Sequence, residues 1–111
     1  MDKITKIAEI FKALSDPTRL RLIQLLSKCQ TENVITGGVC EGGPLCVNAI
    51  AHKLGVSQSA VSQHLRVLRQ AGIVRGARQG NFMHYSIDPT GFEKWKAGLF
   101  ETFGEDLNQG R

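Results

Sequence analysis

Three cysteines, at positions 29, 40 and 46, are the residues of this chain best suited to chemistry. They form no Cys-x-x-Cys pair, which argues against a zinc ribbon or a thioredoxin-type motif. Three thiolates in a trigonal pyramid suit As(III) or Sb(III), and Cd(II), Pb(II) or Hg(II) also accept soft sulfur ligands. Zn(II) would need a fourth ligand, for which His52 is the nearest candidate in the sequence. We therefore treat Cys29, Cys40 and Cys46 as one candidate metal site.

Two other interpretations of these thiols stay open. A pair of them could respond to oxidants or persulfides as a redox switch. Cys29 closes a helical pattern and could instead be a small buried apolar residue, in which case the cysteines have no sensing role. Their odd number argues against a framework of structural disulfides. The sequence suggests no organic cofactor.

A second candidate site is one face of a predicted helix that spans residues 58–71. Ser57 is a good N-cap for this helix, and Gly72 supplies a left-handed residue after its end. Its exposed face carries no acid, although a solvated helix usually mixes Glu with Lys. Gln pairs with adenine, Arg with guanine, and Ser with bases or phosphate. We expect DNA contacts from Gln58, Ser59, Ser62, Gln63, Arg66 and Arg69; His64, at the edge, is either a phosphate donor or a histidine bonded within the core.

The distribution of charge supports this interpretation. The chain has 14 Lys and Arg against 10 Asp and Glu, a formal net charge of +4. Residues 42–87 contain no acid, yet they include Lys53 and the four arginines at positions 66, 69, 75 and 78. A basic block inside a folded segment indicates a polyanionic partner, most plausibly nucleic acid, and a solvated basic face is the alternative.

The surrounding pattern predicts the elements that position these residues. Apolar residues at helical spacing indicate a helix up to Leu14 and a second helix after Asp16-Pro17, with Asp16 as a cap. A glycine-rich, cysteine-bearing loop at 28–45 follows, and then short helices at about 46–54 and 58–71. Residues 73–87 alternate as a two-stranded hairpin with its turn at Gly80, and a last helix follows Asp88-Pro89. The fold class is mainly α with a small β-hairpin, a winged helix-turn-helix, in one domain over residues 1–111 with a flexible tail at 104–111.

The hairpin would be the wing of this fold. It carries Arg75 and Arg78 as candidate DNA contacts, and Arg78 best suits a contact to the DNA backbone or the minor groove. Ala51 and Gly55 suit the close crossing and the turn between the two preceding helices.

Three motifs in this order resemble the ArsR/SmtB family of small repressors. They are Ala13–Leu22 (ALSDPTRLRL), Ser57–Leu65 (SQSAVSQHL), and Leu68–Val74 (LRQAGIV) followed by Tyr85-Ser86-Ile87. The resemblance implies a homodimer formed by the first and last helices, which binds a palindromic DNA operator and is released by an inducer. It also implies a Cys-x-Cys metal pair in some members. Here Cys46 matches its first cysteine, but Asn48 replaces the second.

Other function classes are less consistent with the sequence. The chain has no phosphate-binding loop, HExxH or GxSxG motif, so we expect no enzymatic activity. A protein–protein adaptor of the same fold is an alternative, although an adaptor has no reason to exclude Glu from the helix face. No apolar run reaches the roughly 18 residues of a membrane span, and the start of the chain lacks a signal-peptide pattern, so we expect a cytoplasmic protein with no membrane partner.

Overall fold

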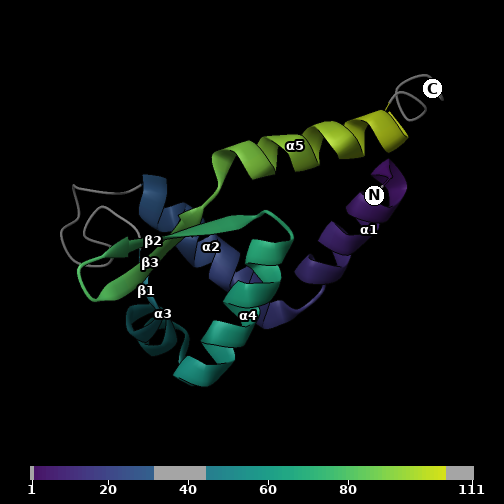
Figure 1. The fold of residues 1–111 in the computed structure, drawn as a ribbon. Coiled ribbons are helices and arrows are strands. Elements are labelled where there is room, and N and C mark those ends of the chain that lie inside the picture. Colours follow the sequence, from purple (N-terminus) through teal and green to yellow (C-terminus); the bar gives the residue numbers. More distant parts are fainter. Residues whose placement is uncertain (1, 32–44, 105–111) are drawn as a thin grey trace.

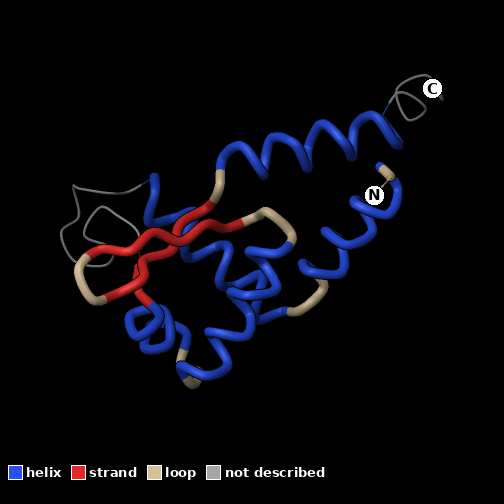
Figure 2. Tube along the Cα trace, viewed as in Figure 1, coloured by secondary structure: helices blue, strands red, loops and turns tan. Residues whose placement is uncertain are grey.

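The computed structural model describes residues 2–31 and 45–104, and their order of elements confirms the predicted winged helix-turn-helix. Helices α1 and α5 lie side by side, while α3, α4 and the sheet form the opposite part of the molecule (Figure 1). The strands run close to α2 and α3 (Figure 2). The elements are α1 (Lys3–Leu14), α2 (Pro17–Thr31), β1 (Leu45–Cys46), α3 (Val47–Leu54), α4 (Gln58–Gln70), β2 (Val74–Gln79), β3 (Phe82–Ile87), α5 (Pro89–Leu99) and a π-helical turn, η1 (Phe100–Gly104).

Short polar side chains fix the starts of four helices. Each accepts a hydrogen bond from a backbone N–H in the first turn, which would otherwise lack a partner. Asp16 and Ser57 are the caps that the sequence predicts, and they begin α2 and α4. The complete set is Asp2, Asp16, Ser57 and Asp88, which accept from the backbone of Thr5, Arg19, Ala60 and Thr90.

The sheet has three strands rather than the two expected. Strand β3 pairs antiparallel with β2 on one side and with β1 on the other, in the order β1-β3-β2. The added strand is only two residues long, Leu45 and Cys46, and it pairs with Tyr85 and His84. A two-residue strand is too short to show the alternation of apolar and polar residues that indicates a strand. The predicted hairpin therefore lacked the edge strand β1.

Three predicted boundaries also need correction. Helix α2 continues through Thr31, so residues 28–31 of the predicted loop are helical, and Leu45 at the other end is in β1. Gly104, placed in the flexible tail, belongs to η1. Cys40, residues 32–44 of the loop and residues 105–111 of the tail lie outside the described residues.

The core lies between α2, α3, α4 and the sheet. Its most deeply buried side chains come from the apolar faces of three helices, and the sheet covers them. Ala51, 6% exposed, lies in this core as the helix crossing requires. The largest buried side chains are Leu22, Leu26, Ile50, Val61, Leu65 and Leu68, each at most 1% exposed.

Helix α5 joins this core through its first turn. The Asp88 backbone N–H donates to the carbonyl of Ile73 at 2.8 Å. Gly91 lies so close to Gly72, at the end of α4, that a Cβ at position 91 would overlap the Gly72 carbonyl oxygen. Farther along, α5 packs against α1, where Lys3 pairs with Glu101. None of the described helices is long and apolar enough to cross a membrane.

Candidate nucleic-acid interface

Helix α4 presents the predicted DNA-contacting face to solvent. Val61, Leu65 and Leu68 are buried at helical spacing, which fixes the rotation of the helix against the core. The opposite side is therefore exposed and free of carboxylates. The side chains that the structure brings together there are Gln58, Ser59, Ser62, Gln63, Arg66 and Arg69, all of them exposed.

The turn before α4 holds it at a fixed angle to α3. Gly55 adopts φ 72°, in the left-handed region that favours glycine, and its backbone N–H donates to the carbonyl of Ala51 at 2.9 Å. Gln58 then donates from Nε2 to Asn48 Oδ1 at 2.9 Å, which joins the two helices at their exposed ends. The sequence did not predict this contact of Asn48, because its partner lies ten positions away on another helix.

His64 lies in a different environment from the other predicted contacts. Its side chain is 20% exposed, and its Nε2 lies 4.0 Å from the Asp16 carboxylate. Arg19 Nη1 lies 3.2 Å from Nδ1. A guanidinium can only donate, so a hydrogen bond here requires Nδ1 without a proton. His64 therefore joins α4 to the start of α2 through side chains.

Asp16 is held by the same contacts. The hydrogen bond from the Arg19 backbone N–H lowers the pKa of Asp16, and the nearby His64 and the Arg19 guanidinium lower it further. Asp16 is therefore ionised at neutral pH, when it caps α2 and faces His64.

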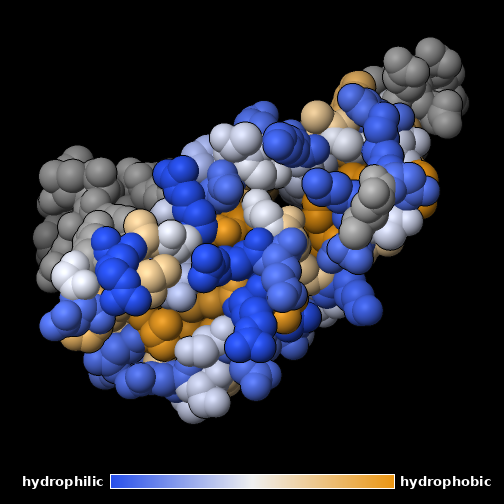
Figure 3. Space-filling model, in the orientation of Figure 1, coloured by the Kyte–Doolittle hydropathy of each residue, from blue (hydrophilic) through white to orange (hydrophobic). Residues whose placement is uncertain are grey.

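The wing extends the basic surface beyond α4. Arg75 and Arg78 are exposed on β2, and the turn after this strand passes through Gly80 at φ 63°. Between α4 and β3 lies an open hollow of about 540 Å³ that Ser62, Arg66, Arg69 and Tyr85 line together with Leu65 and Gln70. In Figure 3, hydrophilic surface covers much of this side, with apolar surface between its clusters. Arg66 and Arg69 of α4 and Tyr85 of the wing therefore line one hollow. Arg75 and Arg78 are three positions apart on β2, so their side chains point to opposite faces of the sheet.

Cys46 is the one cysteine whose side chain the structure describes. It is a free, partly exposed thiol at the residue before α3, and its side chain makes no capping hydrogen bond. The backbone of Cys29 lies in α2. Among residues 2–31 and 45–104 no group of three metal-ligating side chains comes together, so the predicted three-cysteine site falls largely outside what the structure describes.

The sheet register gives Cys46 a neighbour that the sequence did not predict. Cys46 is directly opposite His84 in the β1–β3 pair. Side chains directly opposite in an antiparallel pair lie about 5 Å apart at Cβ. The Nδ1 atom of His84 is buried and has no hydrogen-bond partner in the described part of the chain. His52, the expected fourth ligand, is instead exposed in the last turn of α3.

The known proteins that this chain resembles are transcriptional regulators, which is consistent with a nucleic-acid interface on α4. A family model described as "Bacterial regulatory protein, arsR family" matches residues 39–75, which include α3 and α4. The chain is 39% identical over 87 residues to an uncharacterized HTH-type transcriptional regulator of Methanocaldococcus jannaschii, covering 78% of this chain and 83% of the relative. It is 36% identical over 93 residues to the arsenical resistance operon repressor of Escherichia coli, covering 84% and 68%.

A solved structure gives the same result for the fold. The crystal structure of a possible transcriptional regulator for arsenical resistance superimposes with a TM-score of 0.62 at 38% identity, covering 83% of this chain and 80% of that one. Sequence, helix order and the exposed basic surface thus lead to one conclusion. The chain belongs to the ArsR/SmtB family of winged helix-turn-helix transcriptional regulators.

Proposed function

We propose that the chain is a homodimeric repressor that reads a palindromic operator with α4. The observation that carries this proposal is the exposed face of α4, whose Gln, Ser and Arg side chains include no carboxylate. Such side chains match the donors and acceptors of the major groove. Arg75 and Arg78 of the wing would contact the DNA backbone, whereas both ring nitrogens of His64 already face Arg19 and Asp16.

The terminal helices support the homodimer. Large apolar side chains on α1 and η1 remain in water in the single chain, namely Ile4, Phe11, Phe100 and Phe103, which are 43–61% exposed. Packing of two copies through these helices would bury them and place two α4 helices on one side of the dimer. Recognition helices about 34 Å apart reach half-sites one turn of DNA apart.

Selection of duplexes from a random pool by the purified chain tests this function. We expect enrichment of a palindrome whose half-sites lie about ten base pairs apart. If the dimer neutralises roughly six to ten phosphates, the log–log salt slope of binding is about −5 to −9. No enriched sequence together with a slope near zero would instead favour the adaptor function.

We further propose that soft metals or metalloids release the repressor through its cysteines. As(III) or Sb(III), or else Cd(II) or Pb(II), would bind Cys46 together with Cys29 and Cys40. Two observations support this proposal: Cys46 is a partly exposed thiol at the start of α3, and one relative is named an arsenical resistance operon repressor. Binding at Cys46 would act directly on the helix that precedes α4.

The inducer is tested by operator affinity with As(III), Cd(II) or peroxide present. We expect As(III) to weaken DNA binding in the native chain and to have no effect on the Cys40→Ser and Cys46→Ser variants. A response to peroxide alone would support thiol-redox sensing. If none of the three changes DNA affinity, the cysteines have no sensing role, while the DNA-binding proposal still stands.

His84 provides a further distinction between the metals. A trigonal As(III) site needs only three thiolates, whereas Cd(II) accepts an imidazole as a fourth ligand. We expect His84→Ala to weaken Cd(II) binding, measured by thiolate absorption, and to leave As(III) binding unchanged. The matched control is His52→Ala, which removes an exposed imidazole from α3.

A further inference from the structure

A hollow between α1, α5 and the end of α4 is separate from the DNA-contacting face. Its volume is about 470 Å³, within the usual range for small-molecule sites. Ile7 and Ile10 of α1, Ala71 after α4 and Trp95 of α5 give it apolar walls. Figure 3 shows apolar surface between α1 and α5, with hydrophilic residues around it. The walls therefore suit the apolar part of a small ligand.

The charges at this hollow are mostly positive. Its lining includes three lysines and two acids. The Glu101 carboxylate pairs with Lys3, and Asp88 caps α5 by accepting from the backbone of Thr90 and Gly91. Both acids therefore already have partners.

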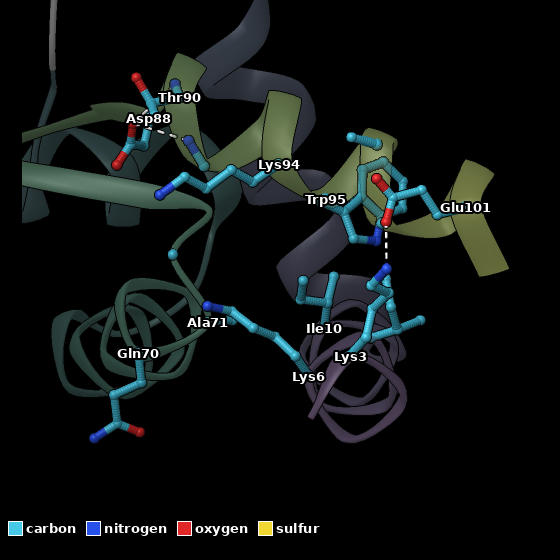
Figure 4. Close-up of a pocket in the computed structure, with 15 residues that line it drawn as sticks. Lys3, Lys6, Ile10, Gln70, Ala71, Asp88, Thr90, Lys94, Trp95 and Glu101 are labelled. Atoms are coloured by element: carbon cyan, nitrogen blue, oxygen red, sulfur yellow. Dashed lines mark hydrogen bonds and ion pairs between the residues drawn. The ribbon is translucent and has the colours of Figure 1, made fainter. Parts of the chain in front are cut away.

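The other two lysines have no such partner. The side chains of Lys6 and Lys94 make no ion pair or hydrogen bond with any described residue. Figure 4 shows both side chains extended toward the loop after α4, whereas Lys3 turns to Glu101. The indole N–H of Trp95, at the same wall, is buried and also lacks an acceptor in the described part of the chain. The hollow thus combines apolar walls with donors that have no acceptor.

We propose that this hollow binds a small monocarboxylate with an apolar body. Lys6 and Lys94 bind the carboxylate, and Ile7, Ile10 and Trp95 contact the apolar part. Charge complementarity selects this class: a neutral apolar molecule leaves the two ammonium groups unpaired, and a cation is repelled by them. The proposal does not depend on DNA binding or on metal binding by the cysteines, and neither α4's exposed face nor Cys46 lines this hollow.

The fluorescence of Trp95 tests the proposal directly, because this is the only tryptophan of the chain. The probes are octanoate, octanamide and octylamine, which share one chain length, at concentrations below micelle formation. We expect a saturable change with octanoate and at least about tenfold weaker binding of octanamide, since charge-assisted hydrogen bonds favour the anion. Octylamine should produce no saturable change.

Variants separate the carboxylate contacts from the apolar walls. Lys6→Gln combined with Lys94→Gln should weaken octanoate binding about tenfold and leave octanamide binding unchanged. Both lysines are exposed, so circular dichroism should show an intact fold. Lys12→Gln removes an equal charge from α1 outside this hollow and should have no effect.

Three results would overturn the proposal. Equal affinity for octanoate and octanamide would show an apolar surface with no preference for a carboxylate. An unchanged octanoate affinity in the double variant would exclude the two lysines as its ligands. Loss of octanoate binding as the protein concentration rises would show that a second copy of the chain, not a carboxylate, occupies the hollow.

Discussion

The helix-turn-helix and the terminal helices use their apolar residues differently. In α3 and α4, Ile50, Val61 and Leu68 are all 0% exposed. No residue of α5 is buried, and α1 buries Ile7, Ile10 and Ala13 but leaves Ile4 61% exposed. The helix-turn-helix, with its candidate DNA-contacting face, thus has its core within one chain, while the terminal helices leave large apolar side chains exposed. We therefore expect the stability of the single chain to depend mainly on the core around the helix-turn-helix, and self-association to depend on the exposed side chains of the terminal helices.

The largest expected difference between the two regions comes from the same substitution, Ile→Ala, made once in each region. Ile50→Ala removes a fully buried side chain and should lower the free energy of unfolding by about 2–5 kcal/mol. Ile4→Ala removes a side chain that is already in water, so at low protein concentration the loss should stay within about 0.5 kcal/mol. Urea denaturation measures both changes, and sedimentation should show weaker self-association only for Ile4→Ala. Equal losses of stability at low concentration would contradict the comparison.

Two glycines of α5 test how firmly this helix is attached to the rest of the chain. A methyl group at Gly91 would overlap the backbone of Gly72, so Gly91→Ala should cost about 1–3 kcal/mol of stability. Gly98→Ala meets only the end of the Ile7 side chain at 3.0 Å, and its better helix propensity offsets that contact. Thermal unfolding should therefore show a clear drop in Tm for the first variant and little change for the second.

A third pair of variants compares the two regions by their effect on DNA affinity. Arg66→Gln removes one side chain from the exposed face of α4 and should weaken binding to the selected operator by about 5- to 100-fold. Lys96→Gln removes the same charge from α5, where it pairs with Glu93, and should change affinity less than about twofold. Fluorescence anisotropy at fixed salt measures both. Equal weakening would mean that net charge, not position on α4, determines binding.

The smallest expected effect concerns the cap of α4. Ser57→Ala removes the hydroxyl that accepts from the Ala60 N–H at 3.1 Å and should cost about 1 kcal/mol of stability. Ser57→Asp keeps an acceptor there and serves as the control, with stability near that of the native chain. Chemical denaturation distinguishes the two variants.

Local patterns were sufficient to predict most of the fold. The spacing of Val61, Leu65 and Leu68 gives the rotation of α4, and hence which side chains are exposed. The caps Asp16 and Ser57 also act within a few residues of themselves, so the sequence shows them directly. Each of these features depends on neighbours in the chain.

The features that the sequence did not reveal depend on distant residues. Strand β1 has two residues, and it is a strand only because β3 lies beside it. The position of His84 opposite Cys46 follows from that register. Arg19 and His64 meet across 45 positions, through the packing of α2 against α4. No local pattern specifies such contacts, and the hollow between α1 and α5 likewise depends on how two distant helices pack.

The contact between Gly72 and Gly91 also determines how α5 can move. The backbones already touch where α4 ends and α5 begins, so the two helices cannot approach each other further or slide past each other at this point. Rotation about the contact is the motion that remains. Helix α5 is about 16 Å long, so a rotation of about 5° would move its far end by about 1.4 Å while its first turn stays in place. The close approach of Gly91 to Gly72 thus ties the start of α5 to the end of α4, and displacements of α5 are expected to grow with distance from this contact.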